Sequence, residues 1–448
     1  MKRNAAKSAW LAMLVAVLVT TAAVAAAQDG PPEPLALDGD MRTAIVDSIL
    51  TAIDEIYVFP DVAEDMDELI RKNLADGKYD DLANASDFAG RLTEDLQSVS
   101  HDLHLHVDWM PPRPQRQGQE LSDEEMEARF LANGRRGNFG FHEIRMLSGN
   151  VAYIKLDMFA DTKYAGPTAV AAMNFVGYAD AIIFDLRQNG GGSPSMIQLL
   201  TSYLVDEMTH LNSFYVRQSD ETIQFWTQDW VSGPRMPDTP VYVLTSGRTF
   251  SAAEEFTYNL KNLDRATIVG ETTGGGAHPV DRHVFPELQI SMSLPFGRAI
   301  NPITGTNWEG TGIDPHIAVP ADQALDVAYL EALKKLEENA DEDQKASLNW
   351  AITGLEIEAD PVNLTEAELT SFAGQYGPRR VWLENGQLWY QRDESPKHKM
   401  IPMGNGWFMF EDLDYFRIEF EQEGGREATG LVGHYSGGRQ DRNPRSGA

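Results

Sequence analysis

The sequence predicts an α/β (α+β) protein with a mixed core, an N-terminal helical domain and a small C-terminal antiparallel β domain. Three observations predict this class. Apolar residues recur every three or four positions over residues 40–100, which is the helical period. From about residue 149, short apolar runs alternate with helical segments, as in a parallel sheet with crossover helices. Beyond residue 362, apolar and polar residues alternate between tight turns, as in antiparallel strands.

The first 27 residues are predicted to be a signal peptide. Lys2, Arg3 and Lys7 precede an apolar run at Trp10–Val19 and a small-residue cleavage site at Ala25–Ala27. A retained membrane anchor is the alternative, but the apolar run is short for a span. We therefore expect an exported protein, periplasmic or secreted, with no stable membrane anchor after removal of the leader.

The composition limits the chemistry and the partners. The chain contains no cysteine, which excludes disulfides and thiol catalysis. Its formal net charge is −31, and loss of the three basic residues in the leader makes it about −34. Such an acidic surface disfavours nucleic acid and anionic membranes as partners. The charge itself does not identify a reaction.

Changes of period and composition divide the chain into domains. The expected units are 28–110 (N-terminal helical domain), 111–137 (linker around one short acidic helix), 138–340 (core), 341–361 (acidic spacer) and 362–448 (β domain). The expected helices are Met41–Tyr57, Ala63–Leu74, 167–178, 194–206 and 252–263, and the expected core strands are Val151–Phe159, Ala181–Leu186, Val241–Leu244 and Ala266–Val269. Each strand is a short apolar run, and each helix has apolar residues at helical spacing.

The most informative segment surrounds Ser251. The apolar strand Val241–Leu244 ends in a small-residue turn, and helix formers begin at Ala252. A serine there has its hydroxyl beside unpaired N–H groups and the positive end of a helix dipole, which can stabilise an oxyanion. Chemistry in parallel sheets gathers at the carboxyl ends of strands, where Ser251 lies. Ser251 is therefore a candidate nucleophile, with a simple N-cap as the alternative.

A second strand end carries three successive glycines in Asp185–Gly192. Glycines let the backbone approach a substrate and point N–H groups at an anion. A phosphate loop is the competing interpretation, but no Gly-Lys-Ser/Thr follows and no GxGxxG is present. We favour an oxyanion hole made by the N–H of Gly191 (or Gly192) together with that of Ala252.

A serine nucleophile needs a base, and three of the ten histidines cluster in Ser100–His106. A three-histidine metal site is awkward, because strand-like alternation puts His104 and His106 on one face and His101 on the other. The cluster also lacks the His-Glu-x-x-His pattern of a zinc helix. We therefore expect no metal, and for His104 and His106 no functional role.

The order of these features resembles a known group. The resemblance rests on three motifs, at Phe184–Gly192, Arg248–Phe256 and Trp308–Pro315. They resemble the tail-specific (carboxyl-terminal processing) proteases and their relatives, the tricorn protease core and the repeats of interphotoreceptor retinoid-binding protein. The resemblance covers roughly residues 40–330. It implies a crotonase-like αββ-spiral core and a serine peptidase that acts on peptides or proteins without a metal or cofactor.

Two departures refine what the resemblance implies. Tail-specific proteases carry a lysine about 25 residues after the serine, where this chain has Gly276. The tricorn-like arrangement instead uses a histidine preceded by a serine, with a later glutamate. Ser100 with His101, and Glu309, match those places, so His101 is expected to take the proton from Ser251. His278 is the rival base and a possible substrate contact.

The second departure concerns substrate capture. Only about 31 residues separate His106 from Asn138, too few for the PDZ domain that tail-specific proteases usually carry there. We therefore expect shorter peptides rather than tagged protein tails as substrates. Two alternatives stay open on the same scaffold: a non-catalytic binder of an apolar small molecule, and a small-molecule esterase or amidase.

Overall fold

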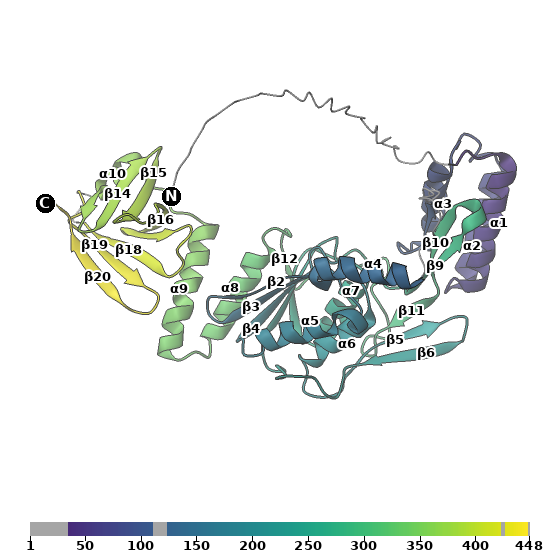
Figure 1. Cartoon of the computed structure of the whole chain (residues 1–448), viewed down its shortest axis with the longest axis horizontal. Coiled ribbons are helices and arrows are strands. Elements are labelled where there is room, and N and C mark those ends of the chain that lie inside the picture. The colour runs from purple at the N-terminus through teal and green to yellow at the C-terminus, as the bar shows by residue number, and fades with distance from the viewer. Residues whose placement is uncertain (1–34, 111–122, 423–425, 447–448) are drawn as a thin grey trace, which may run out of the picture.

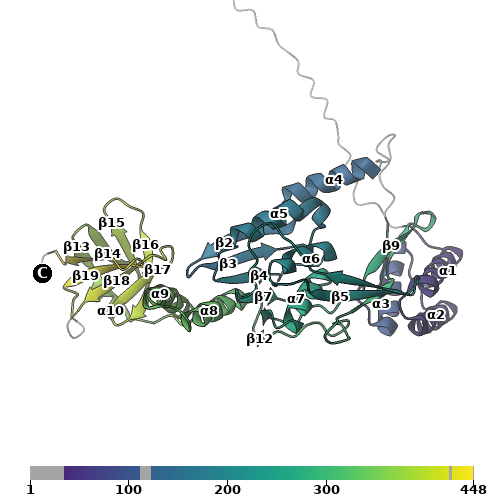
Figure 2. The same ribbon diagram turned by 90° about the horizontal axis from the view of Figure 1, so that it is seen from below.

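The computed structural model describes residues 35–110, 123–422 and 426–446, so the expected signal peptide lies outside the described residues. The N-terminal helices, the central sheet and the C-terminal β domain follow one another along the long axis (Figures 1 and 2). Within the described ranges, no helix combines the length and the apolar character needed to cross a membrane.

The N-terminal helical domain contains α1 (Gly39–Ile56), α2 (Pro60–Ala75) and α3 (Ala85–Ser100). Its apolar faces share one core with a hairpin that comes from far along the chain, β9 (Val280–Phe285) and β10 (Ile290–Pro295). Strand β1 (His106–Trp109) follows α3 and pairs antiparallel with β10. The sequence does not predict this hairpin, which lies beside α1 and α3 in Figure 1.

The central sheet has six strands in the order β12-β8-β7-β4-β3-β2. Its strands are β2 (Phe141–Leu147), β3 (Val151–Leu156), β4 (Ala181–Asp185), β7 (Val241–Thr245), β8 (Ala266–Gly270) and β12 (Ile317–Ala318). All are parallel except β2, which runs antiparallel to β3. The predicted α/β class is thereby confirmed.

Helices cover both faces of this sheet. Helices α5 (Thr162–Phe175), α6 (Pro194–Ser202) and α7 (Ala252–Asn262) share a core with Phe184, whereas α8 (Ala324–Glu337) packs on the opposite face against Ile183. Neighbouring residues of β4 thus face different helices, as the period of two requires. A further antiparallel sheet, β11-β5-β6, flanks the core and contains β5 (His210–Val216), β6 (Glu221–Trp226) and β11 (Gly297–Ile300).

Two predicted connections contain helices. Helix α4 (Asp123–Arg136) lies within the expected linker and is followed by the short η1 (Asn138–Gly140). The expected acidic spacer is α9 (Glu342–Ala359), which begins with a capping box between Asp341 and Gln344. Leu348 and Ile352 of α9 join the core under α8, which explains why an acidic segment forms a packed helix.

The C-terminal domain begins with α10 (Glu366–Phe372) and continues as eight antiparallel strands in sequence order. They are β13 (Gly374–Tyr376), β14 (Arg379–Glu384), β15 (Gln387–Arg392), β16 (His398–Gly404), β17 (Trp407–Phe410), β18 (Phe416–Glu421), β19 (Gly430–Tyr435) and β20 (Gln440–Pro444). A bridge between Tyr376 and Arg445 brings the last strand beside the first. The predicted β domain is therefore an up-and-down barrel (Figure 1).

Candidate active site

Ser251 lies in the turn between β7 and α7, where the sequence predicts it. It is the N-cap residue of α7, with φ 56° and ψ −122°. A positive φ is unfavourable for a residue with a Cβ, so surrounding contacts must hold this conformation. The Ser251 N–H donates a hydrogen bond of 2.9 Å to the Glu254 carboxylate, and the residue is half-buried.

Glu254 ties the serine to a glycine-rich loop. Its buried carboxylate accepts four hydrogen bonds: from Ser251 N (2.9 Å), Thr273 Oγ1 (2.5 Å), Gly275 N (2.7 Å) and Gly276 N (2.9 Å). Burial raises the pKa of Glu254, although these hydrogen bonds oppose the shift. The backbone of the candidate nucleophile and the loop at 273–276 are therefore positioned by one side chain.

The glycine turn after β4 approaches the same serine. A Cβ on Gly191, whose φ is +113°, would lie 2.8 Å from the Ser251 Cβ, so only glycine permits this approach. The Gly191 N–H already donates to Asn189 Oδ1 at 2.9 Å. The N–H groups of Gly192 and Ala252 make no hydrogen bond within the described part of the chain. Of the three predicted oxyanion donors, Gly192 and Ala252 are the ones left available.

His101, the base expected from the sequence, makes no hydrogen bond to Ser251 in the described part of the chain. His101 is the exposed, left-handed C-cap of α3, and its backbone N–H donates to Gln97 O. Its imidazole makes no hydrogen bond among the described residues, although it lines a cavity beside the site. The Ser100 hydroxyl accepts a hydrogen bond of 3.3 Å from the Asp102 N–H.

His104, for which no role was expected, lies against the serine segment. Its buried imidazole packs on the ring of Phe250, the residue before Ser251, with centroids 4.6 Å apart. A Cβ on Gly276 would lie 2.6 Å from His104 Cε1. Gly276 stands where the tail-specific relatives are expected to carry their lysine. The missing side chain at that position makes room for an imidazole.

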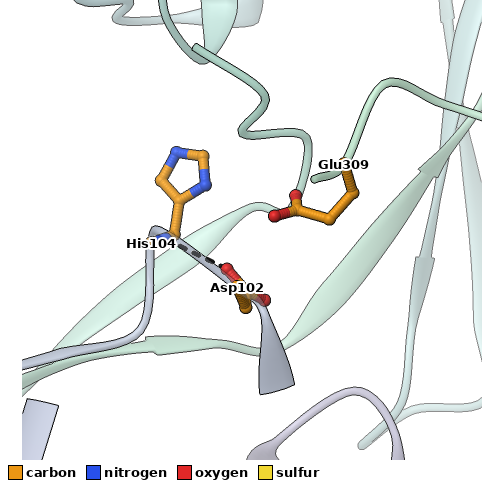
Figure 3. A group of neighbouring side chains, drawn as sticks. All are labelled: Asp102, His104 and Glu309. Carbon is orange, nitrogen blue, oxygen red and sulfur yellow. Dashed lines mark hydrogen bonds between the residues drawn. The ribbon is translucent and has the colours of Figure 1, made fainter. Parts of the chain in front are cut away.

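Asp102, His104 and Glu309 form a compact cluster, with one ligand atom of each within 4.8 Å of the others. In Figure 3 a ring nitrogen of His104 faces the Glu309 carboxylate, with Asp102 below. His104 Nδ1 and Glu309 Oε1 are both buried without a hydrogen-bond partner in the described part of the chain. Two such atoms are costly unless they are complementary, so we interpret them as partners.

Burial shifts the pKa values of His104 and Glu309 in opposite directions. It lowers the pKa of His104 to about 4, against the opposing charge of Asp102. Burial, together with the charge of Asp102, raises the pKa of Glu309 to about 7. The imidazole is therefore neutral near pH 7 and able to accept a proton, while the nearby carboxylate can stabilise the cation that results.

His278 belongs to the wall of this cluster. Its Nδ1–H donates to Asp102 Oδ2 at 2.6 Å and lies 3.5 Å from Glu309 Oε2, while the ring meets the edge of Phe59. Burial disfavours the imidazolium, but the hydrogen bond and charge of Asp102 outweigh it, so the pKa of His278 is raised. The Tyr57 hydroxyl also donates to Asp102, at 3.4 Å. His278 is thus a firmly held group facing the cavity.

The residues that could gather around a cation differ from the three histidines considered from the sequence. The cluster combines His104 with the carboxylates of Asp102 and Glu309, and such a set of ligands can bind a divalent cation. Asp102 is already engaged by His278 Nδ1 and by the His104 N–H at 3.0 Å. The His106 ring does not belong to this cluster. Its Nδ1 is hydrogen-bonded to the His104 carbonyl, and its Nε2 lies 3.3 Å from the Asp108 carboxylate.

Comparison with protein families identifies the class to which this fold and site belong. Residues 150–319 match the model of peptidase family S41, and residues 36–132 match the model of the N-terminal domain of peptidase S41 in eukaryotic IRBP. The class is that of the serine peptidases. The chain thus contains a peptidase S41 family domain together with the N-terminal domain of that family, which confirms the resemblance seen in its motifs.

Several solved structures are similar to the chain at low identity. A photosystem II D1 C-terminal processing protease is 18% identical over 38% of this chain and 43% of its own, with a TM-score of 0.32. A lipoprotein from Streptococcus agalactiae is 14% identical over 68% of this chain and 99% of its own (TM-score 0.43). The tricorn protease is 11% identical over 71% of this chain and 37% of its own, with a TM-score of 0.40. The chain thus spans less than half of the two proteases.

Proposed function

We propose that the protein is an exported serine peptidase that cleaves peptides through an acyl-enzyme, with Ser251 as nucleophile and His104 as base. The observation that carries this assignment is the packing of the His104 ring on Phe250, with a ring nitrogen turned toward Glu309. This arrangement leaves Nε2 as the atom available to the serine. His101 and Ser100 then line the approach to the site instead of acting in proton transfer.

The proposed mechanism uses only groups of this chain. Ser251 Oγ attacks the peptide carbonyl carbon while His104 Nε2 takes its proton, and Glu309 stabilises the imidazolium. The N–H groups of Gly192 and Ala252 donate to the oxyanion. The imidazolium then protonates the leaving amine as the C–N bond breaks. A water, deprotonated by the same imidazole, hydrolyses the acyl-enzyme and restores Ser251.

A fluorophosphonate reagent tests this assignment directly, since it reacts with an activated serine without needing the natural substrate. We expect stoichiometric labelling of Ser251 in the wild type, located by mass spectrometry of the labelled peptide. Ser251→Ala should abolish labelling and lower peptide turnover by about 10⁴-fold or more, because the covalent pathway is lost. An unlabelled wild-type protein would favour the non-catalytic binder instead.

Three histidine variants identify the base. His104→Gln should slow labelling by about 10³-fold, because general base assistance is lost. His101→Gln should stay within about threefold of the wild type, and His278→Gln should have an intermediate effect through Asp102 and Glu309. If His101→Gln were the variant that abolished labelling, the base would be His101 and the present assignment would be wrong.

Export and the absence of a PDZ domain are parts of this proposal that rest on the sequence. Amino-terminal sequencing of the protein recovered from a periplasmic extract should begin near Gln28. Recovery of the intact leader in a membrane fraction would contradict export by cleavage. Small-molecule esters provide the comparison for the esterase alternative: we expect peptides to be turned over with the higher kcat/KM.

A further inference from the structure

A cavity of about 460 Å³ opens beside the Glu309 and His278 wall of the proposed active site. Its lining mixes apolar residues such as Phe59 and Ile300 with polar groups from four residues, which are Ser100, His101, Thr306 and Asn307. The proposed mechanism uses none of these four side chains. The cavity therefore has room and hydrogen-bonding groups that peptide hydrolysis itself does not explain.

Arg298 of β11 is the permanently charged group of this lining. Its guanidinium lies over two aromatic rings, 5.9 Å from the centroid of Phe59 and 5.4 Å from that of Tyr215. The side chain is exposed and makes no hydrogen bond or ion pair within the described ranges. Although the chain has 68 acidic and 37 basic residues, this arginine has no acidic partner among the residues that the structure describes.

The two aromatic rings limit where the guanidinium can go. A cation over ring faces is attracted by their quadrupoles, and a planar guanidinium held in this way loses less entropy when it binds a ligand. Arg187, by contrast, uses its guanidinium internally, on Asp185 at 2.6 Å and on the Ala321 carbonyl. Arg298 keeps its donors for something that enters the cavity.

The two carboxylates nearest this space, one of which (Glu309) lines it, are already engaged within the protein. Glu309 Oε2 accepts from the N–H groups of Ala277 and His278, and its Oε1 is buried. Asp102 is fully buried and bonded to His278. An anion in the cavity would therefore find the unused donors of Arg298, beside a Glu309 carboxylate whose Oε2 already accepts two hydrogen bonds.

We propose that this cavity is a substrate subsite that binds a carboxylate of the peptide, with Arg298 as the residue that determines this specificity. Arginine matches a carboxylate with two parallel N–H···O bonds, which gives directional recognition as well as charge. The carboxylate comes either from an Asp or Glu side chain near the scissile bond or from the peptide C-terminus. The inference rests on the proposed peptidase function, but binding tests it separately.

The kinetic experiment uses internally quenched peptides in matched pairs. One set carries Glu or Gln at each position around the scissile bond, and a second set ends in a free carboxylate or an amide. We expect the wild type to favour one carboxylate member by roughly tenfold or more in kcat/KM, which corresponds to a charge-assisted hydrogen bond. The pair that shows the preference identifies the source of the carboxylate.

Variants assign the preference to the arginine. Arg298→Gln should remove the preference for the carboxylate peptide. Arg298→Lys should retain part of this preference, since lysine keeps the positive charge but lacks the two parallel N–H donors of the guanidinium. Arg439→Gln is the matched control, because Arg439 is also exposed and lies over a tyrosine ring, 4.6 Å from the centroid of Tyr435 in the C-terminal barrel. The control should leave the preference unchanged. Melting temperatures of all three variants show whether they remain folded.

Binding of fluorescent forms of the same peptides to Ser251→Ala separates the two proposals. A carboxylate preference in Kd that disappears in the Ser251→Ala, Arg298→Gln double variant supports the subsite, even if the wild type cleaves none of the peptides. Turnover by the wild type with equal rates for both members of every pair overturns the subsite and leaves the peptidase standing. A preference that survives Arg298→Gln also overturns it.

Discussion

Glu254→Gln tests whether one buried carboxylate positions the nucleophile. Glu254 Oε1 accepts from Thr273 and Gly275, and Oε2 accepts from Ser251 and Gly276. Glutamine has the same shape, but its NH₂ group must replace one of these oxygens. If the NH₂ group takes the Oε2 position, the N–H groups of Ser251 and Gly276 both lose their acceptor. If it takes the Oε1 position, the Gly275 N–H loses its acceptor and the Thr273 hydroxyl must turn to accept from the amide. Either way, two hydrogen bonds to a charged acceptor are lost.

The magnitude follows from those two contacts. Hydrogen bonds to a charged acceptor contribute about 1.5–3 kcal/mol each, so two of them amount to about 3–6 kcal/mol. Burial raises the pKa of Glu254, and relief of that burial cost by the neutral amide reduces the loss. We expect a net decrease of about 2–4 kcal/mol in the free energy of unfolding, measured by urea denaturation.

Activity should fall by more than stability explains. Ser251 holds a positive φ, and replacement of its charged N–H acceptor by a neutral amide lets the serine relax toward an ordinary N-cap conformation. Labelling by the fluorophosphonate should slow by about 10- to 100-fold under conditions where the variant is fully folded.

Glu255→Gln is the matched control, because Glu255 is the next residue of α7, is equally buried and is directed to Asn212 and Asn259 instead of the glycine loop. Burial raises the pKa of Glu255 to about 7, so an amide resembles its protonated form. This control should keep most of its labelling rate. Equal rates for the Glu254 and Glu255 variants would refute the positioning role.

Two further predictions concern the imidazole of His104. Gly276→Ala should lower the labelling rate by at least tenfold, because its Cβ would lie 2.3 Å from Phe250 Cζ and 2.6 Å from His104 Cε1, the two rings that pack beside Ser251. Gly247→Ala, whose Cβ would meet no atom within 4 Å, should leave the rate unchanged. Equal rates for both variants would contradict the placement of the His104 and Phe250 rings. In a pH profile of kcat/KM, activity should rise as His104 loses its proton near pH 4 and rise again as Glu309 ionises near pH 7, since both the neutral base and the charged carboxylate favour proton transfer. Glu309→Gln should remove the upper step, and a profile that keeps this step in the variant would assign it to another group.

The position of Ser251 could be predicted because it depends on local sequence. The apolar run before it and the helix formers after it determine a strand end and a helix start, whatever the rest of the fold does. The four core strands and the C-terminal β domain follow from periodicity in the same way. Closure of that domain into a barrel could not be predicted, since the Tyr376–Arg445 pairing joins strands about 70 residues apart.

The histidine proposed as the base could not be predicted from the alternation of side chains along a strand. The strand-like alternation expected over Ser100–His106 does not hold, because the strand begins only at His106. The preceding segment is a turn that starts with the left-handed backbone of His101. In a turn, neighbouring side chains do not alternate between two faces, so His104 points inward independently of His106. One signal was present in the sequence: Gly276 removes a side chain beside the serine, and some other group must fill that space.

The proposed site lies at a junction between two domains, and this has a physical consequence for catalysis. Asp102 and His104 come from the segment after α3, whereas Ser251, His278 and Glu309 come from the core. The relative positions of these side chains depend on how the helical domain packs on the β9–β10 hairpin. Buried residues of the hairpin belong to the apolar core of the helical domain. Because Asp102 joins the His104 backbone to the His278 ring, the polar network and the apolar core position the base together. Small displacements at this junction would move the imidazole relative to the serine without unfolding either domain, so catalysis should be more sensitive than global stability to substitutions along it.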